Sequence, residues 1–221
     1  MDTDTPHALL SIRERIKAAH NRFGAPPAEV QLIAVSKTFG REAMVPYLEA
    51  GQRLFGENRV QEAQEKWPEL RARFPDIELH LIGPLQSNKA RHAVALFDVI
   101  QTVDRDRIAE ALASEMRRVG RSLPCFVQVN IGAEEQKAGV APSEAVSFVQ
   151  RCRDEHGLNI VGLMCIPPDG APPGPFFAHL AQLAREADAP LLSMGMSGDF
   201  ETAIAMGATH VRVGSALFGS R

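Results

Sequence analysis

Lys37 combines a reactive side chain with a position that could activate it. It follows the apolar run at residues 32–35 and shares the parity of Ile33 and Val35, so in an extended strand all three lie on one face. If that face lines an apolar interior, desolvation disfavours the ammonium form and leaves an amine able to attack an aldehyde or ketone. The alternative is a lysine at a strand end that extends into solvent.

Two segments near the end of the chain have the composition of an anion-binding site. Residues 193–198 read SMGMSG and residues 213–217 read VGSAL, so small residues and hydroxyl groups are concentrated in both. Small residues let backbone N–H groups approach an anion closely. Ser197, Gly214 and Ser215 are therefore candidate phosphate ligands.

Arg212 interrupts the apolar stretch that precedes the second of these segments. A buried guanidinium cannot lose its charge, so it needs a partner, which is either a carboxylate on a neighbouring strand or a ligand. Few carboxylates fall on the predicted strands. An amine, a phosphate site and an arginine together suit pyridoxal 5'-phosphate, whose aldehyde would form a Schiff base with Lys37 and whose pyridine nitrogen would face Arg212.

The elements that must position these residues alternate between strand and helix. Apolar strands are predicted near residues 31–36, 53–55, 79–82, 98–101, 125–130, 160–165, 190–194 and 210–214. Strands that are apolar along their whole length are typical of a parallel sheet covered on both faces. Eight such units predict an α/β fold of the (β/α)8, or TIM, barrel type, with its site at the strand ends. A doubly wound sheet is the alternative, but no GxGxxG motif follows the first strand.

Two helices have clear signals at their ends. Thr5 and Pro6 are typical of a helix start and Gly24 of a helix end, so an extra helix is expected before the first strand. A second helix is predicted over residues 104–119, with Asp104 as its N-cap and Gly120 at its end. Its apolar stripe would consist of Ile108, Leu112, Met116 and Val119. We expect residues 1–221 to form a single barrel domain.

The composition limits the partners and the location of the protein. The chain has 221 residues, of which 45% are hydrophobic, and a formal net charge of −3. This balance argues against nucleic acid or a membrane surface as a partner. The sequence shows no signal peptide or long apolar segment, and its three cysteines are irregularly spaced. We therefore expect a cytoplasmic monomer with buried thiols and no metal site.

Three other polar features have a structural interpretation. Asn58 could contact a ligand or cap the following helix, and capping is the commoner use. His80 lies inside a predicted strand, where a histidine is usually a hydrogen-bonded core residue. Residues 86–89, QSNK, are expected to open a helix through Ser87 or Asn88.

Six segments spread over nearly the whole chain resemble one known family. They read AVSKTF (34–39), AGQRLFGENRVQE (50–62), HLIGPLQSNK (80–89), VNIGAEEQKAGV (129–140), GLMCIPP (162–168) and SMGMSGDFETAIAMGATHVRVGSALFG (193–219). The family is the YggS/PROSC group of pyridoxal phosphate homeostasis proteins, which are single barrels similar to the N-terminal domain of bacterial alanine racemase. The resemblance implies the cofactor contacts made by Lys37, Ser197, Gly214, Ser215, Arg212, Asn58, His80 and Ser193.

The sequence departs from the family's pattern at four positions. Arg59 stands where the family commonly has an aromatic residue, Ala208 where it has serine, and Gly198 where it often has aspartate. Ser215 replaces a threonine and keeps the hydroxyl group, so the phosphate contact is expected to survive. Arg59, Lys137 and residues 86–89 have no assigned role.

The same residues bear on whether the cofactor is used in catalysis or only held. A cationic arginine at the pyridine nitrogen disfavours its protonation and weakens the cofactor as an electron sink. A racemase would need a second base, and the single tyrosine, Tyr47, is expected to lie outside the barrel. The sequence favours a protein without robust catalysis. Its role, implied by the resemblance, is in vitamin B6 and amino-acid homeostasis, with apo-enzymes as possible recipients of the cofactor. A weak amino-acid racemase and a Schiff-base aldolase are the alternatives.

Overall fold

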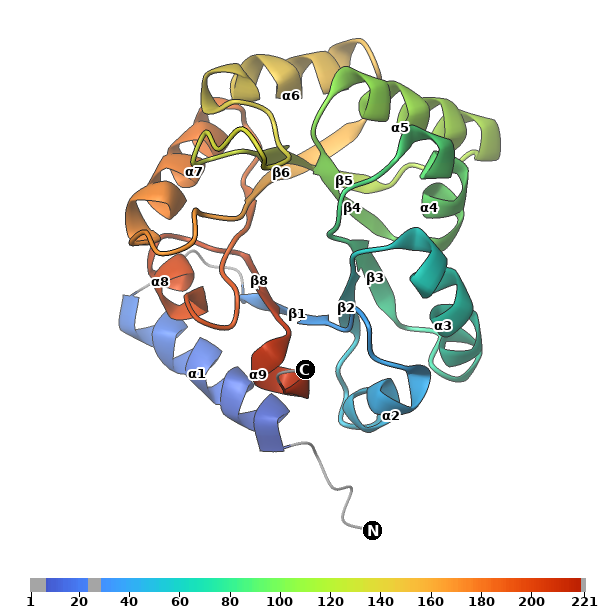
Figure 1. The fold of residues 1–221 in the computed structure, drawn as a ribbon, viewed down its shortest axis with the longest axis vertical. Helices are drawn as coiled ribbons and strands as arrows, with labels where there is room; N and C mark the ends of the chain where they lie inside the picture. The colour runs from blue at the N-terminus through green and yellow to red at the C-terminus, as the bar shows by residue number, and fades with distance from the viewer. Residues whose placement is uncertain (1–6, 24–28, 220–221) are drawn as a thin grey trace.

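Eight parallel strands form a closed barrel in the order of the sequence (Figure 1). This computed structural model describes residues 7–23 and 29–219. Each strand pairs with the next, and the last pairs with the first through four registered positions. The strands are β1 (Gln31–Val35), β2 (Leu54–Glu57), β3 (Glu78–Leu81), β4 (Val99–Val103), β5 (Pro124–Val129), β6 (Asn159–Cys165), β7 (Leu191–Ser193) and β8 (His210–Val213). The predicted (β/α)8 barrel is confirmed.

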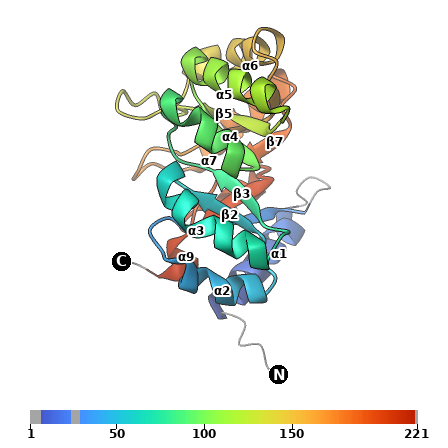
Figure 2. The ribbon, with the colours of Figure 1, turned by 90° about the vertical axis from the view of Figure 1, so that its right-hand side faces the viewer.

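Helices surround the barrel, as Figures 1 and 2 show, and the predicted extra helix precedes the first strand. This first helix, α1, lies against α8 and α9, near the end of the chain. The predicted signals at Thr5, Pro6 and Gly24 lie outside the described residues. The helices are α1 (His7–Phe23), α2 (Arg41–Glu49), α3 (Val60–Arg73), η1 (Ser87–Lys89), α4 (Ala90–Leu96), α5 (Asp106–Val119), η2 (Pro142–Glu144), α6 (Ala145–Asp154), α7 (Gly174–Glu186), α8 (Phe200–Ala205) and α9 (Ser215–Phe218).

The start of α5 corrects one prediction. The helix begins at Asp106, two residues later than expected, and the residue before it is Arg105 in an extended conformation. Asp104 is not the N-cap, because its carboxylate instead forms an ion pair with Arg105 at 2.5 Å. A residue type suited to capping does not act as a cap when a neighbouring cation takes up its side chain.

The apolar stripe of α5 is confirmed for three of its four residues. Ile108, Leu112 and Met116 are buried, and Gly120 ends the helix in the left-handed region at a φ of +67°. Val119 is 42% exposed, contrary to the prediction. Helical spacing predicts which side chains lie on the same face of α5. It does not predict how much of that face is buried against the barrel.

The core lies between the strands and the surrounding helices. For example, the ring of Phe55 on β2 lies 4.9 Å from that of Trp67 on α3, and both are fully buried. The three cysteines, Cys125, Cys152 and Cys165, are buried as predicted. Burial raises the pKa of each thiol to about 12, so these thiols stay protonated. Within the described residues, no helix has the length and apolarity needed to cross a bilayer.

Candidate functional site

A cavity of about 430 Å³ opens at the carboxyl ends of the strands, where the sites of TIM barrels lie. Its volume falls in the range of about 300–1,000 Å³ typical of small-molecule sites. Six of the eight predicted site residues come together here, and His80 and Ser193 do not line the cavity. The lining consists of Val35, Lys37, Asn58, Ile82, Ile166, Met196, Ser197, Gly198, Arg212, Gly214 and Ser215.

Lys37 lies two residues beyond the end of β1, on the wall of this cavity. Val35 lines the same cavity, so the parity predicted for the two residues is confirmed. The Lys37 side chain is only partly buried. Lys37 therefore does not have the fully apolar surroundings that the strand pattern suggested. The reason is that β1 ends two residues before it.

The turn around Lys37 has a strained backbone. Thr38 has a φ of +68°, in the left-handed region that a β-branched residue rarely adopts. The N–H of Phe39 donates to the carbonyl of Ser36 at 3.2 Å and closes the turn. Such conformations cost about 1–3 kcal/mol and persist only where surrounding contacts fix them.

A buried ion pair supplies these contacts on the outer side of the strand. Lys66 Nζ of α3 lies 2.5 Å from Glu57 Oε1 and donates to the carbonyl of Ser36 at 2.7 Å. The hydroxyl of Ser36 donates to the same carboxylate at 2.7 Å, and the indole of Trp67 donates to it at 3.1 Å. Ser36, the residue before Lys37, is thus held at its carbonyl by Lys66 and at its hydroxyl by Glu57. Sequence reasoning missed Glu57 and Lys66, although a glutamate at the end of an apolar strand was a usable signal.

The predicted phosphate site is formed where β8 passes into α9. Ser197 Oγ accepts hydrogen bonds from the backbone N–H groups of Gly214 and Ala216, both at 3.3 Å. A Cβ atom at Gly214 would lie 3.3 Å from the side chain of Val35. A side chain at Gly214 would therefore crowd Val35, which lines the same cavity. Backbone N–H groups and hydroxyls arranged in this way suit an oxyanion.

Arg212 lies on the floor of the cavity with its guanidinium buried. It donates to the hydroxyl of Ser193 at 2.7 Å and to the backbone carbonyl of Cys165 at 2.8 Å. These two bonds use part of its five N–H donors, and no carboxylate among the described residues forms an ion pair with it. Burial lowers the pKa of Arg212, because the surroundings penalise its charge. The remaining N–H groups of Arg212 are therefore suited to donate to a hydrogen-bond acceptor on a ligand.

His80 and Ser193 lie below the cavity, inside the barrel. Ser193 donates to Gln101 Oε1 at 2.6 Å, and Gln101 Nε2 lies 2.9 Å from His80 Nδ1. His80 Nε2 in turn lies 2.9 Å from the carboxylate of Glu78. His80 is therefore a hydrogen-bonded interior histidine, as the more cautious interpretation expected. Gln101 was missed because a glutamine within an apolar strand gave no motif.

Of the remaining residues named in the sequence analysis, one lines the cavity and two lie elsewhere. Asn58 lines the cavity, and the residue before α3 is Arg59, so the capping interpretation of Asn58 is wrong. Arg59 is 76% exposed and pairs with Glu62 at 3.1 Å, so it forms no part of the wall. Lys137 pairs with Glu134 at 2.6 Å.

Residues 86–89 form the expected start of a helix, but without the expected side-chain cap. The 3₁₀ helix η1 begins at Ser87, and its N-cap residue is Gln86, which makes no capping hydrogen bond through its side chain. A single 3₁₀ turn leads directly into α4. Its role stays unassigned.

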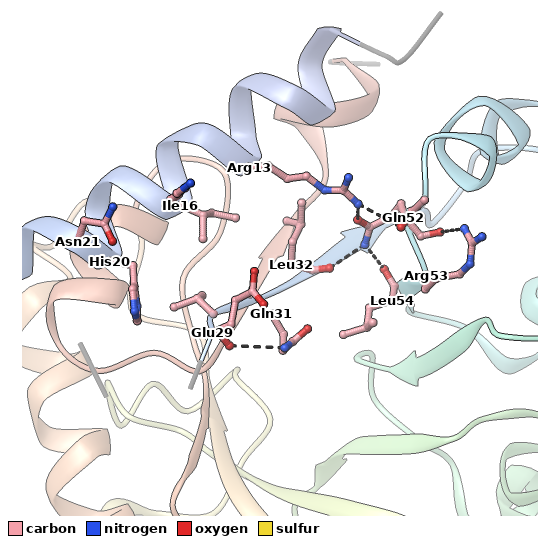
Figure 3. A pocket seen from close by; sticks show the side chains of 13 residues that line it. Arg13, Ile16, His20, Asn21, Glu29, Gln31, Leu32, Gln52, Arg53 and Leu54 are labelled. Atoms are coloured by element: carbon pink, nitrogen blue, oxygen red, sulfur yellow. Dashed lines mark hydrogen bonds between the residues drawn. The ribbon is translucent and has the colours of Figure 1, made fainter. Parts of the chain in front are cut away.

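A larger cavity, of about 710 Å³, lies at the opposite end of the barrel (Figure 3). Gln52 donates to the carbonyls of Leu32 and Leu54 at 2.7 and 2.8 Å, and Arg13 donates to the carbonyl of Gly51 at 3.2 Å. These polar side chains bind backbone groups at the starts of the strands. Their contacts indicate a structural role, so the smaller cavity is the better candidate site.

Comparison with known proteins identifies the family. The family described as alanine racemase, N-terminal domain, matches residues 8–221. A pyridoxal phosphate homeostasis protein of Vibrio cholerae is 40% identical over 95% of this chain and 93% of its own length. One of Escherichia coli is 39% identical over 99% and 97%. The chain belongs to the pyridoxal phosphate homeostasis family of alanine racemase N-terminal-like proteins.

Solved structures agree with this placement. PipY of Synechococcus elongatus without pyridoxal phosphate (PLP) has a TM-score of 0.82 and 43% identity, covering 94% of this chain and all of PipY. PipY with PLP bound has a TM-score of 0.79 and 41% identity over the same shares. Alanine racemase of Clostridium difficile, at 14% identity and a TM-score of 0.73, shares the fold over 57% of its own length.

Proposed function

We propose that this protein binds pyridoxal 5'-phosphate covalently through Lys37 and takes part in vitamin B6 and amino-acid homeostasis without robust catalysis of its own. The observation that carries the proposal is that Lys37, Arg212 and the Ser197–Gly214–Ser215 group line one cavity. Each meets a different part of the cofactor. The bound cofactor of PipY supports the proposal, because PipY is 41% identical to this chain.

The residues of the cavity fit the groups of the cofactor. Pyridoxal phosphate supplies an aldehyde, a phosphate and an aromatic ring with a basic nitrogen. Lys37 Nζ would be the amine that binds the aldehyde carbon, with loss of water. The hydroxyls of Ser197 and Ser215 would hold the phosphate, next to the backbone N–H groups of Gly214 and Ala216 that donate to Ser197 Oγ. Arg212 donates to the ring nitrogen with an N–H that has no partner within the described residues, and Asn58 borders the same space.

The position of Tyr47 favours a binding role over racemisation. Tyr47 lies on α2, outside the barrel, and its hydroxyl donates to the backbone carbonyl of Leu217 at 2.5 Å. Its ring lies 4.5 Å from that of Phe218. Burial raises the pKa of Tyr47, which disfavours the phenolate that would act as a base. Within the described residues, the only tyrosine is thus in use as a structural contact.

Borohydride reduction followed by peptide mapping tests the covalent bond. The purified protein, incubated with pyridoxal phosphate, should show an absorbance band that borohydride removes. The reduced adduct, with the mass of the cofactor, should map to Lys37. Lys37→Ala should lose the band, whereas Lys17→Ala, at an exposed lysine of α1, should keep it.

Three outcomes would contradict the proposal. An adduct mapped to another lysine would move the site away from this cavity. A colourless protein that is trapped by a sugar phosphate and borohydride would favour the aldolase alternative. Exchange of the α-hydrogen of a free amino acid in D₂O, abolished by Lys37→Ala, would favour the racemase alternative.

A further inference from the structure

A chain of four hydrogen bonds crosses the interior of the barrel from the cavity to its opposite end. It begins at Arg212 on β8 and passes through Ser193 on β7, Gln101 on β4 and His80 on β3. It ends at the carboxylate of Glu78, the first residue of β3. The three residues between its ends are buried, whereas the side chain of Glu78 is 46% exposed.

The recorded orientation of the Gln101 amide and the two ends of the chain give each bond its direction. A guanidinium has only donors, so Ser193 Oγ accepts from Arg212 and its own hydrogen goes to Gln101 Oε1. The amide of Gln101 is thereby oriented with its NH₂ group toward His80 Nδ1. An ionised carboxylate has only acceptors, so Glu78 accepts from His80 Nε2–H. With the Gln101 amide in this orientation, every bond of the chain has a donor and an acceptor, and all donors point away from the cavity.

The surroundings of the chain support this arrangement. The ring of His210 on β8 lies 6.1 Å from that of His80. Burial lowers the pKa of His210 to about 4, so this ring is neutral near pH 7. The hydrogen bond from His80 lowers the pKa of Glu78. Glu78 is thus the anion and Arg212 the cation at the two ends of the chain.

We propose that Gln101, His80 and Glu78 act as positioning residues that hold the Arg212 guanidinium in one orientation, and so set the electronic state of a cofactor ring bound above it. This inference rests on the proposed function. Aligned hydrogen bonds in a low-dielectric interior polarise one another, so charge at one end is felt at the other. The chain holds one N–H of Arg212 on Ser193, and donors of the same guanidinium remain for the cavity.

Replacing Glu78 tests the charge at the far end of the chain without touching the cavity. In Glu78→Gln the amide oxygen can still accept from His80, so the bonds persist while the negative charge is lost. We expect the absorbance and emission maxima of bound pyridoxal phosphate to shift relative to the wild type. The matched control is Asp76→Asn, which removes an exposed carboxylate that pairs with Arg53 at 2.6 Å. Its maxima should not shift.

Replacing Gln101 tests the middle of the chain. Gln101→Met keeps the size of the side chain and removes both of its hydrogen bonds. We expect a larger shift in the same direction and a loss of cofactor affinity of about fivefold, the scale of one hydrogen bond between neutral groups. The control is Thr102→Val on the same strand, because Thr102 is buried but its hydroxyl has no partner among the described residues.

The outcomes separate this inference from the proposed function. If the wild type shows no cofactor bound at Lys37, both fall. If the wild type binds the cofactor but Glu78→Gln keeps its maxima, the coupling to Glu78 is wrong whether or not Gln101→Met folds. If Thr102→Val shifts the maxima as much as Gln101→Met, the effect reflects disturbed packing and the positioning role is overturned.

Discussion

Lys66 Nζ lies 2.5 Å from Glu57 Oε1, and the two side chains are buried, with 7% of Lys66 and none of Glu57 exposed. The pair fixes the carbonyl of Ser36, the residue directly before Lys37. A buried ion pair need not add net stability, but losing one partner leaves an uncompensated charge in the interior. The ion pair explains why the strained turn at Thr38 persists, because it holds the carbonyl of Ser36, at the start of that turn, in one position.

Removing the cation should destabilise the protein strongly. Lys66→Met is expected to lower the free energy of unfolding by about 3–5 kcal/mol, because Glu57 stays buried without its partner. Urea unfolding at pH 7 measures the change. Lys17→Met, at an exposed position of α1, is the control and should change it by less than about 0.5 kcal/mol. The double variant Lys66→Met, Glu57→Gln should recover part of this loss of stability, because no unpaired charge stays buried. If the free-energy changes of the two single variants simply add in the double variant, the two side chains do not act as a pair.

Replacing Arg212 should change the spectrum of the bound cofactor. Arg212→Ala removes the donor that we place at the ring nitrogen and is expected to weaken cofactor retention. Absorbance titration across the pH range measures both effects. Arg59→Ala should leave the spectrum unchanged, because Arg59 is exposed and outside the cavity. Identical spectra for Arg212→Ala and the wild type would show that the ring nitrogen does not face this residue.

Removing the two hydroxyls of the phosphate site should release the cofactor. The double variant Ser197→Ala, Ser215→Ala is expected to lose bound pyridoxal phosphate during dialysis, because two donors to the phosphate are gone. The cofactor that remains can be measured by absorbance after alkaline release. Ser147→Ala, at an exposed serine of α6, is the control. Full retention by the double variant would place the phosphate elsewhere.

Stability should fall at acidic pH because of His210. Its pKa is lowered from 6.5 to about 4 by burial, so between these values the unfolded chain binds more protons than the folded one. The free energy of unfolding should therefore fall, by about 1–3 kcal/mol, as the pH drops from 6.5 to 4, with no contribution above 6.5.

Urea unfolding at a series of pH values tests this slope. His210→Gln should flatten it, because the replacement does not titrate in this range. His179→Gln, at an exposed histidine of α7, should retain the slope of the wild type. An equally steep slope in His210→Gln would assign the acid sensitivity to other groups.

Local patterns were enough to predict the barrel and most of the cavity. An apolar run or a helical stripe is a property of adjacent residues, so all eight strands were found within a few residues. Strand parity likewise placed Lys37 on the cavity side with Val35. One error arose because a neighbouring residue binds the side chain, as Arg105 binds Asp104. Another arose because the helix extends beyond the part of the barrel that buries it, as at Val119.

Local sequence patterns specify which elements form, and the sequence contains the lysine, the arginine and the glycine- and serine-rich loops of the candidate site. Which distant side chains meet follows from the folded barrel alone. Ser193 and Gln101 are 92 residues apart and bond only because the closed barrel brings β7 and β4 to face each other across its interior. Such contacts depend on the register of all the intervening strands, and no local pattern of residues encodes it.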